Sequence, residues 1–161
     1  MNKKRLSLII IVIIFIINFT LFYFNEPLED NYGSNYETGF VSKVIDGDTV
    51  VIDGESVRLL GMDTDERGEP CYSEAKKRLE ELVLNKEVNL EKDGEDRDQY
   101  DRRLRWIFIE IDARSINVDL LLVEEGLAIA RFYDNKKYKE EIIKAEQEAR
   151  ENKIGCKWKN L

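Results

Sequence analysis

Three short charged segments of this chain lie beside apolar runs and carry side chains that could do chemistry. The first, "IDGDTV", contains Asp48 directly after a glycine. The second, "RLLGMDTDERGEP", opens with Arg58 and continues into carboxylates that include Asp63 and Glu66. The third, "DRDQYDRRLRW", contains Arg102. All three fall at expected strand ends or loops, where functional side chains are often found.

The combination of these side chains indicates phosphodiester chemistry. Asp48 and Asp63 could hold a hard cation through oxygen ligands, and Arg58 and Arg102 could hold a phosphate by forked hydrogen bonds. A cation with two arginines would neutralise the charge of a phosphodiester during attack. Glu66 would supply a general base in a chain that contains no histidine.

Each segment alone also has a structural explanation. The Asp-Gly pair in the first is typical of a turn between apolar runs. Arg58 lies in an apolar strand, so it could simply pair with a later carboxylate, because a buried unpaired charge is costly. The arginines of the third segment could decorate a solvated turn, and Arg67 and Glu69 are interpreted as solvated loop charges. Only the three segments together favour an active site.

The expected elements place these segments around a small barrel. Alternating apolar residues predict strands, and apolar residues three or four apart predict helices. Asp53-Gly54 predicts a tight hairpin, and Ser73 is a candidate helix N-cap. The expected strands are 40–45, 49–53, 56–62, 87–92 and 103–111, and the expected helices are 73–86, 118–126 and 136–153. This order predicts an α+β fold, a five-stranded OB-type β-barrel with three α-helices.

The N-terminal segment has the features of a membrane anchor. Lys3, Lys4 and Arg5 precede residues 6–24, which are nineteen residues without a charge and long enough to span a bilayer. Bulky residues rather than a small-residue cleavage site end the apolar run, which favours an uncleaved signal anchor. The basic tail then stays in the cytoplasm, and the remaining chain faces outward.

We therefore expect a single-pass protein of the cell membrane with an extracellular C-terminal domain, or a secreted protein if the apolar segment is cleaved. Residues 25–39 mix Pro, Gly, Ser, Asn and acids, which is linker composition. The predicted organisation is a cytoplasmic tail and transmembrane helix (1–24), a linker (25–39) and a folded domain (40–161).

Composition limits the functions open to this domain. Residues 40–161 carry 22 basic and 29 acidic side chains, a net charge of −7. A protein that binds nucleic acid by neutralising many phosphates is normally basic. If this acidic domain binds a polyanion, it must do so through a local group of basic residues. The two cysteines, Cys71 and Cys156, can form a disulfide if the domain lies outside the cell, and would remain buried thiols in the cytosol.

Five segments taken in order resemble the staphylococcal nuclease (thermonuclease) family. They are "IDGDTV", "VRLLGMDTDE", "DQYDRRLRWIFI", "VEEGLA" and "KAEQEARENKIGCKW", and the similarity covers roughly residues 40–158. The resemblance implies an OB-type barrel with three helices. It also implies a Ca²⁺-dependent phosphodiesterase that acts on DNA and RNA, preferably single-stranded or unstructured, and leaves 3′-phosphate and 5′-hydroxyl ends.

The resemblance also implies a role for each matching residue. The metal ligands would be Asp48, Asp63 and the backbone carbonyl of Thr64, the catalytic residues Arg58, Glu66 and Arg102, and the substrate-binding residues Tyr100 and Tyr133. Cys71 precedes the first helix of the domain and Cys156 follows the third. Those helices pack near each other in the family's fold, so a disulfide between the two cysteines is implied.

Two positions depart from the family pattern. Asp65 replaces the proline usual before the catalytic glutamate, which predicts a looser loop around Glu66, and Asp101 replaces the glycine usual before the second arginine, which predicts a restricted backbone. We expect a monomer without a protein partner. The alternative to a nuclease is a non-catalytic OB module that binds nucleic acid or a protein.

Overall fold

The computed structural model describes residues 36–159. The predicted membrane segment, 6–24, and nearly all of the predicted linker lie outside the described residues. Within 36–159 no helix has both the length and the apolar character needed to cross a bilayer. The membrane anchor and the domain boundaries therefore remain predictions.

Five strands close into the predicted barrel. Antiparallel pairing joins β3, β2, β1, β5 and β6 in that order, and a parallel pairing of β3 with β6 closes the ring. The strands are β1 (Glu37–Val44), β2 (Thr49–Ile52), β3 (Glu55–Leu59), β5 (Glu87–Glu91) and β6 (Arg103–Ile111). The tight turn expected at Asp53-Gly54 joins β2 to β3, with both residues at positive φ.

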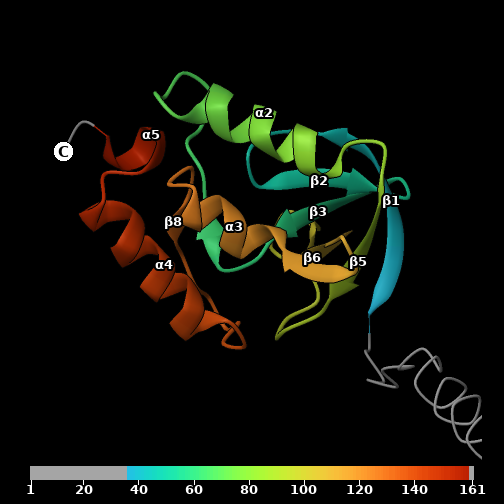
Figure 1. Ribbon diagram of the computed structural model, residues 1–161. Coiled ribbons are helices and arrows are strands. Elements are labelled where there is room, and N and C mark those ends of the chain that lie inside the picture. The colour runs from blue at the N-terminus through green and yellow to red at the C-terminus, as the bar shows by residue number, and fades with distance from the viewer. Residues whose placement is uncertain (1–35, 160–161) are drawn as a thin grey trace, which may run out of the picture. The chain divides into compact units, whose positions relative to one another are not determined.

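The helices cover the barrel from one side. They are α2 (Tyr72–Val83), α3 (Val118–Glu124), α4 (Lys139–Glu151) and the short α5 (Gly155–Trp158). Figure 1 shows α3 between the barrel and α4, with α2 above the strands. The core runs through this interface, where Trp106 of β6 is fully buried and meets the Tyr138 ring edge-on at a centroid distance of 5.1 Å.

The expected boundaries differ from the structure at several ends, for example in the last long helix, expected at 136–153 and found at Lys139–Glu151. The first strand begins at Glu37, inside the expected linker. The helix N-cap is Cys71, so Ser73 lies within the first turn and the capping prediction was wrong. The expected strand 56–62 breaks after Leu59, because Gly61 turns the chain at φ +70° over Trp106. A Cβ at Gly61 would lie 2.3 Å from that indole ring, so no larger residue fits there.

Three short strands were not predicted. Strand β4 (Met62–Asp63) pairs with β8 (Ile129–Ala130), and β7 (Arg114–Asn117) forms a hairpin with β6. Two residues are too few to show an alternating pattern, and β7 runs directly into α3, whose first turn Asn117 caps by accepting the Leu120 N–H at 3.0 Å. The β4–β8 pair matters for function, because it carries Asp63.

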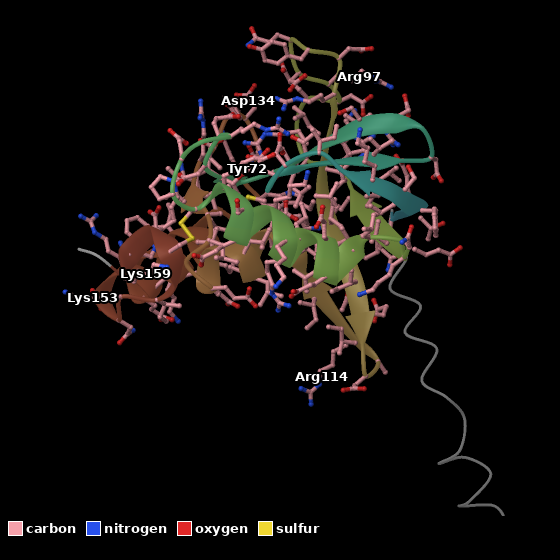
Figure 2. All side chains as sticks on the ribbon, turned by 90° about the horizontal axis from the view of Figure 1, so that it is seen from above. Tyr72, Arg97, Arg114, Asp134, Lys153 and Lys159 are labelled. Atoms are coloured by element: carbon pink, nitrogen blue, oxygen red, sulfur yellow. A yellow bond between two sulfur atoms is a disulfide. The ribbon has the colours of Figure 1, made fainter. Side chains whose placement is uncertain are left out.

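A disulfide joins Cys71 to Cys156, with the two Cα atoms 5.4 Å apart. Its yellow bond lies at the end of α2 that faces the C-terminal helices (Figure 2). The bridge therefore connects the segment between β4 and α2 to α5, which are 85 residues apart in the chain.

Candidate active site

Arg58 is the centre of the candidate site. It lies in β3, opposite Thr49 of β2, and its side chain is only 10% exposed. Its Nη1 lies 3.1 Å from Asp48 Oδ2, and its Nη2 donates to Asp63 Oδ1 at 2.8 Å. The same nitrogens donate to the carbonyls of Leu59 and Met62 at 3.1 and 3.2 Å. The arginine is thus held in one orientation before any substrate arrives.

Asp48 is buried and fully engaged. Its Oδ2 accepts from the N–H and the hydroxyl of Thr64 at 3.1 and 3.0 Å, and its Oδ1 accepts from the Thr49 hydroxyl at 3.0 Å. Burial raises the pKa of Asp48 above its usual value, although the neighbouring charge of Arg58 opposes this shift. Asp48 therefore joins the second charged segment to the first.

Arg102 is linked to Asp48 through the hydroxyl of Thr49. Its Nη1 donates to Thr49 Oγ1 at 3.3 Å, and Thr49 in turn donates to Asp48. Asp98 orients this arginine, since both Nε and Nη2 of Arg102 lie 2.7 Å from Asp98 Oδ2. The structure thus brings the second predicted arginine next to the first carboxylate.

A cavity of about 530 Å³ opens beside the two arginines. Arg58 and Arg102 line it together with Tyr100 and Tyr133, the two residues expected to contact substrate. Both tyrosines are largely exposed, at 71% and 65%. Arg102 lies over the Tyr100 ring, with its Cζ 5.4 Å from the ring centroid. Asp134, labelled in Figure 2, lies on the same side of the molecule as the loop that carries Arg97.

Asp93 fixes the loop that carries Tyr133. Its Oδ2 accepts from the N–H groups of Lys136 and Lys137 at 2.8 and 2.9 Å and from the indole N–H of Trp106 at 3.3 Å. One carboxylate oxygen therefore ties this loop to the segment after β5. The cavity wall is part of the packed fold rather than a free loop.

Glu66 stands apart from the other predicted residues. It is exposed, and its carboxylate makes no hydrogen bond or ion pair with the rest of residues 36–159. Its backbone is fixed, however, because the Glu66 N–H donates to Glu69 Oε2 at 2.7 Å and the Glu69 N–H donates to the Glu66 carbonyl at 2.9 Å. Glu69 is an exposed loop carboxylate, as expected, and it also accepts a backbone hydrogen bond within this turn. The structure therefore fixes the backbone of Glu66 and leaves its carboxylate exposed, outside the lining of the cavity.

The two departures from the family pattern have clear structural roles. Asp65 is not loose: its Oδ2 accepts the Cys71 N–H at 2.8 Å, and its Oδ1 pairs with Lys157. Burial opposes ionisation here, but the hydrogen bonds from Lys157 and Cys71 are stronger together and lower the pKa of Asp65. Asp101 adopts φ +64°, the left-handed conformation that glycine favours and aspartate tolerates.

A metal ion at this place would be held by oxygen atoms alone. No three acidic, His or Cys side chains of residues 36–159 are grouped closely enough to bind an ion by themselves. Asp48 and Asp63 lie on the two nitrogens of one guanidinium, and Thr64 follows Asp63 directly. An ion held by these two carboxylates and the Thr64 carbonyl would replace contacts that the carboxylates now make with protein groups. This set fits Ca²⁺, which completes its shell with water, better than metals that prefer imidazole or thiolate.

Several site residues escaped the sequence reasoning. Arg131 pairs with Asp63 Oδ2 at 2.8 Å and lies over the Tyr133 ring at 5.6 Å. It directly follows β8, whose two residues show no pattern, so only the β4–β8 pairing could reveal its place beside Asp63. Thr49 and Asp98 were within reach, because each lies in a quoted segment, directly after Asp48 or four residues before Arg102.

Comparisons with known proteins agree with this geometry. A family model described as "Staphylococcal nuclease homologue" matches residues 56–160. The thermonuclease of Staphylococcus intermedius is 35% identical over 142 residues, which cover 81% of this chain and 80% of that protein. The thermonuclease of Staphylococcus hyicus is 31% identical over an alignment of 173 residues, which covers 98% of this chain and 99% of that protein. The micrococcal nuclease of Shigella flexneri is 30% identical over 126 residues, which cover 73% of this chain and 71% of that protein. The chain belongs to the staphylococcal nuclease family.

Proposed function

We propose that this protein is a Ca²⁺-dependent nuclease that hydrolyses DNA and RNA to products with 3′-phosphate ends. The observation that carries the proposal is the placement of Arg58 between Asp48 and Asp63, beside a cavity that it shares with Arg102. Two arginines that line one cavity, one of them paired with two carboxylates, suit a phosphodiester and a cation. A module that only binds has no evident need for this set.

Arg58 and Arg102 would contact the phosphate and stabilise the extra negative charge of the five-coordinate transition state. A bound Ca²⁺, held by Asp48, Asp63 and the Thr64 carbonyl, would neutralise charge on the phosphate. The contacts of Arg58 with backbone carbonyls keep its guanidinium oriented, so little reorganisation is needed during the reaction.

Glu66 would accept a proton from the attacking water. The water oxygen forms a bond to phosphorus, and the bond from phosphorus to the 5′-oxygen breaks. The departing 5′-oxygen takes a proton from solvent water to become a hydroxyl, and the phosphate stays on the 3′-oxygen. Tyr100 and Tyr133 would stack on bases next to the scissile bond, which favours single-stranded or unstructured substrates because paired bases do not expose their faces.

We further propose that the domain acts outside the cell, anchored by residues 6–24. The apolar segment with its basic flank supports this location. The disulfide also supports it, because such bonds persist in oxidising compartments and are rare in the cytosol.

The test uses the full-length chain in mild detergent with a single-stranded DNA oligonucleotide. We expect cleavage with Ca²⁺ and none with a chelator. We expect Glu66→Gln to lower kcat by about 100-fold or more, the usual effect of losing a general base. Glu87→Gln, an exposed carboxylate at the start of β5, is the matched control and should cleave as the wild type does.

Two results would contradict the proposal. Cleavage that Glu66→Gln does not slow would remove the assigned base. Binding of the oligonucleotide without any Ca²⁺-dependent cleavage would favour the non-catalytic OB module instead.

A further inference from the structure

The loop that carries Glu66, residues 64–70, is fastened at one point by an ion pair. Asp65 accepts the Cys71 N–H at 2.8 Å through Oδ2 and pairs with Lys157 through Oδ1. The two side chains are only 13% and 17% exposed. A pair this well shielded is less weakened by solvent than the surface pairs of this protein.

The partner side of this contact is itself fixed. Lys157 belongs to α5, and its backbone N–H donates to the Gly126 carbonyl at 3.1 Å. Cys156, its neighbour in α5, is bridged to Cys71. Asp65 therefore binds both sides of the disulfide: the backbone N–H of one half-cystine and the side chain next to the other.

The residue before Asp65, Thr64, is fixed to Asp48, the carboxylate that pairs with Arg58. Thr64 donates from its N–H and its hydroxyl to Asp48. Glu66 thus follows two consecutive fixed residues, one tied to the barrel and the other to α5. The Glu66 carboxylate has no partner of its own within 36–159, so its placement depends on these backbone contacts and on Glu69.

We propose that Asp65 is a positioning residue for Glu66, and that it acts by tying the Glu66 loop to Lys157 and the Cys71 N–H. The inference rests on the proposed nuclease function. It predicts that this pair affects the chemical step more than the binding of Ca²⁺ or nucleic acid. Arg58 pairs with Asp48 and Asp63, and Thr49 links Arg102 to Asp48, and none of these contacts involves α5.

The test compares Asp65→Ala and Lys157→Met with the wild type in the full-length chain. We expect each to lower kcat about tenfold, since small misplacements of a catalytic group cost rate steeply, while KM changes less than about twofold. The double variant should be no slower than Asp65→Ala alone, because both changes remove one contact. Lys157→Arg keeps a cation and should restore most of kcat.

Lys159→Met is the matched control. Lys159 lies two residues further along and pairs with Glu74 of α2 at 3.2 Å, so its loss removes a lysine–carboxylate contact from the same end of the molecule without touching the loop. We expect its kcat to equal that of the wild type.

Hydrogen exchange of the backbone amides of residues 64–69, which precede Pro70, gives a readout that does not need activity. Exchange should be faster in Asp65→Ala and Lys157→Met than in the wild type or Lys159→Met. Unchanged exchange would overturn the proposal, and so would unchanged kcat in an enzyme that Glu66→Gln inactivates. If Glu66→Gln cleaves normally while exchange rises as expected, the proposed role of Glu66 fails but the tie between Asp65 and the loop stands.

Discussion

Asp119 is a fully buried carboxyl in the first turn of α3. Its Oδ2 accepts the Ile107 N–H at 2.9 Å, while its Oδ1 has no hydrogen-bond partner in the described part of the chain. Burial raises the pKa of Asp119 to about 8, and the N–H of Ile107 opposes this shift only in part. The group is therefore neutral in the folded protein at pH 7.

This shift makes the folded state less stable as the pH rises. Between the unfolded pKa of about 4 and the folded value, the native state binds a proton that the unfolded chain has lost. The contribution of Asp119 to the free energy of unfolding therefore falls by about 1.4 kcal/mol per pH unit and levels off above pH 8. Asp119→Asn, which keeps an acceptor for Ile107, should remove this dependence and be more stable at pH 7.5.

Urea unfolding at pH 5, 6, 7 and 8 checks the prediction. Asp112→Asn, which removes an exposed carboxylate nearby in the chain, is the control and should follow the wild type. A stability difference between Asp119→Asn and wild type that does not grow with pH would show that Asp119 is ionised in the folded protein.

At the scale of elements, the chain just after α3 approaches the start of α5 closely at backbone atoms. Gly126 follows α3 at φ +64°, and a Cβ there would lie 2.0 Å from the Ile154 carbonyl oxygen, just before α5. We expect Gly126→Ala to destabilise the protein by about 2–4 kcal/mol, because it adds a backbone clash to the cost of a left-handed alanine.

Gly54→Ala separates these two costs. Gly54 also has positive φ, at +88°, but a Cβ there meets nothing within 4 Å. Its substitution should therefore cost only about 1–2 kcal/mol, the conformational part alone. Equal midpoints of urea unfolding for Gly126→Ala and Gly54→Ala would mean that α5 shifts away from α3 without lowering the free energy of unfolding.

At the scale of the whole molecule, the disulfide links two segments that lie 85 residues apart in the chain. Closing a loop of that length restricts the unfolded chain, and the loop-entropy estimate is a stabilisation of about 4–5 kcal/mol. Cys71→Ser combined with Cys156→Ser should lower the free energy of unfolding by about this amount, measured by urea titration.

Reductant provides the control for that prediction. It should lower the stability of the wild type to that of the double serine variant and leave the variant itself unchanged. Two titratable thiols in the unreduced wild type, found by alkylation and mass measurement, would contradict the bridge.

The barrel could be predicted because its strands carry their own signals. Strand β6 is a run of apolar and alternating residues. The Asp53-Gly54 turn sets the register of the hairpin between β2 and β3. The breaks were harder to predict. The kink at Gly61 depends on the Trp106 ring beneath it, and β4 exists only because β8 pairs with it. These contacts join residues far apart in the chain, so no local pattern reports them.

The sequence by itself determined which chemical groups this protein can use: two carboxylates, two arginines and a glutamate in motifs that define the family. Tertiary structure alone decided how they are held. Arg58 bridges Asp48 and Asp63, Thr49 links Arg102 to Asp48, and Asp65 binds a lysine 92 residues away. The physical reason is that residue type sets what a side chain can donate or accept, whereas its partner depends on how distant segments pack.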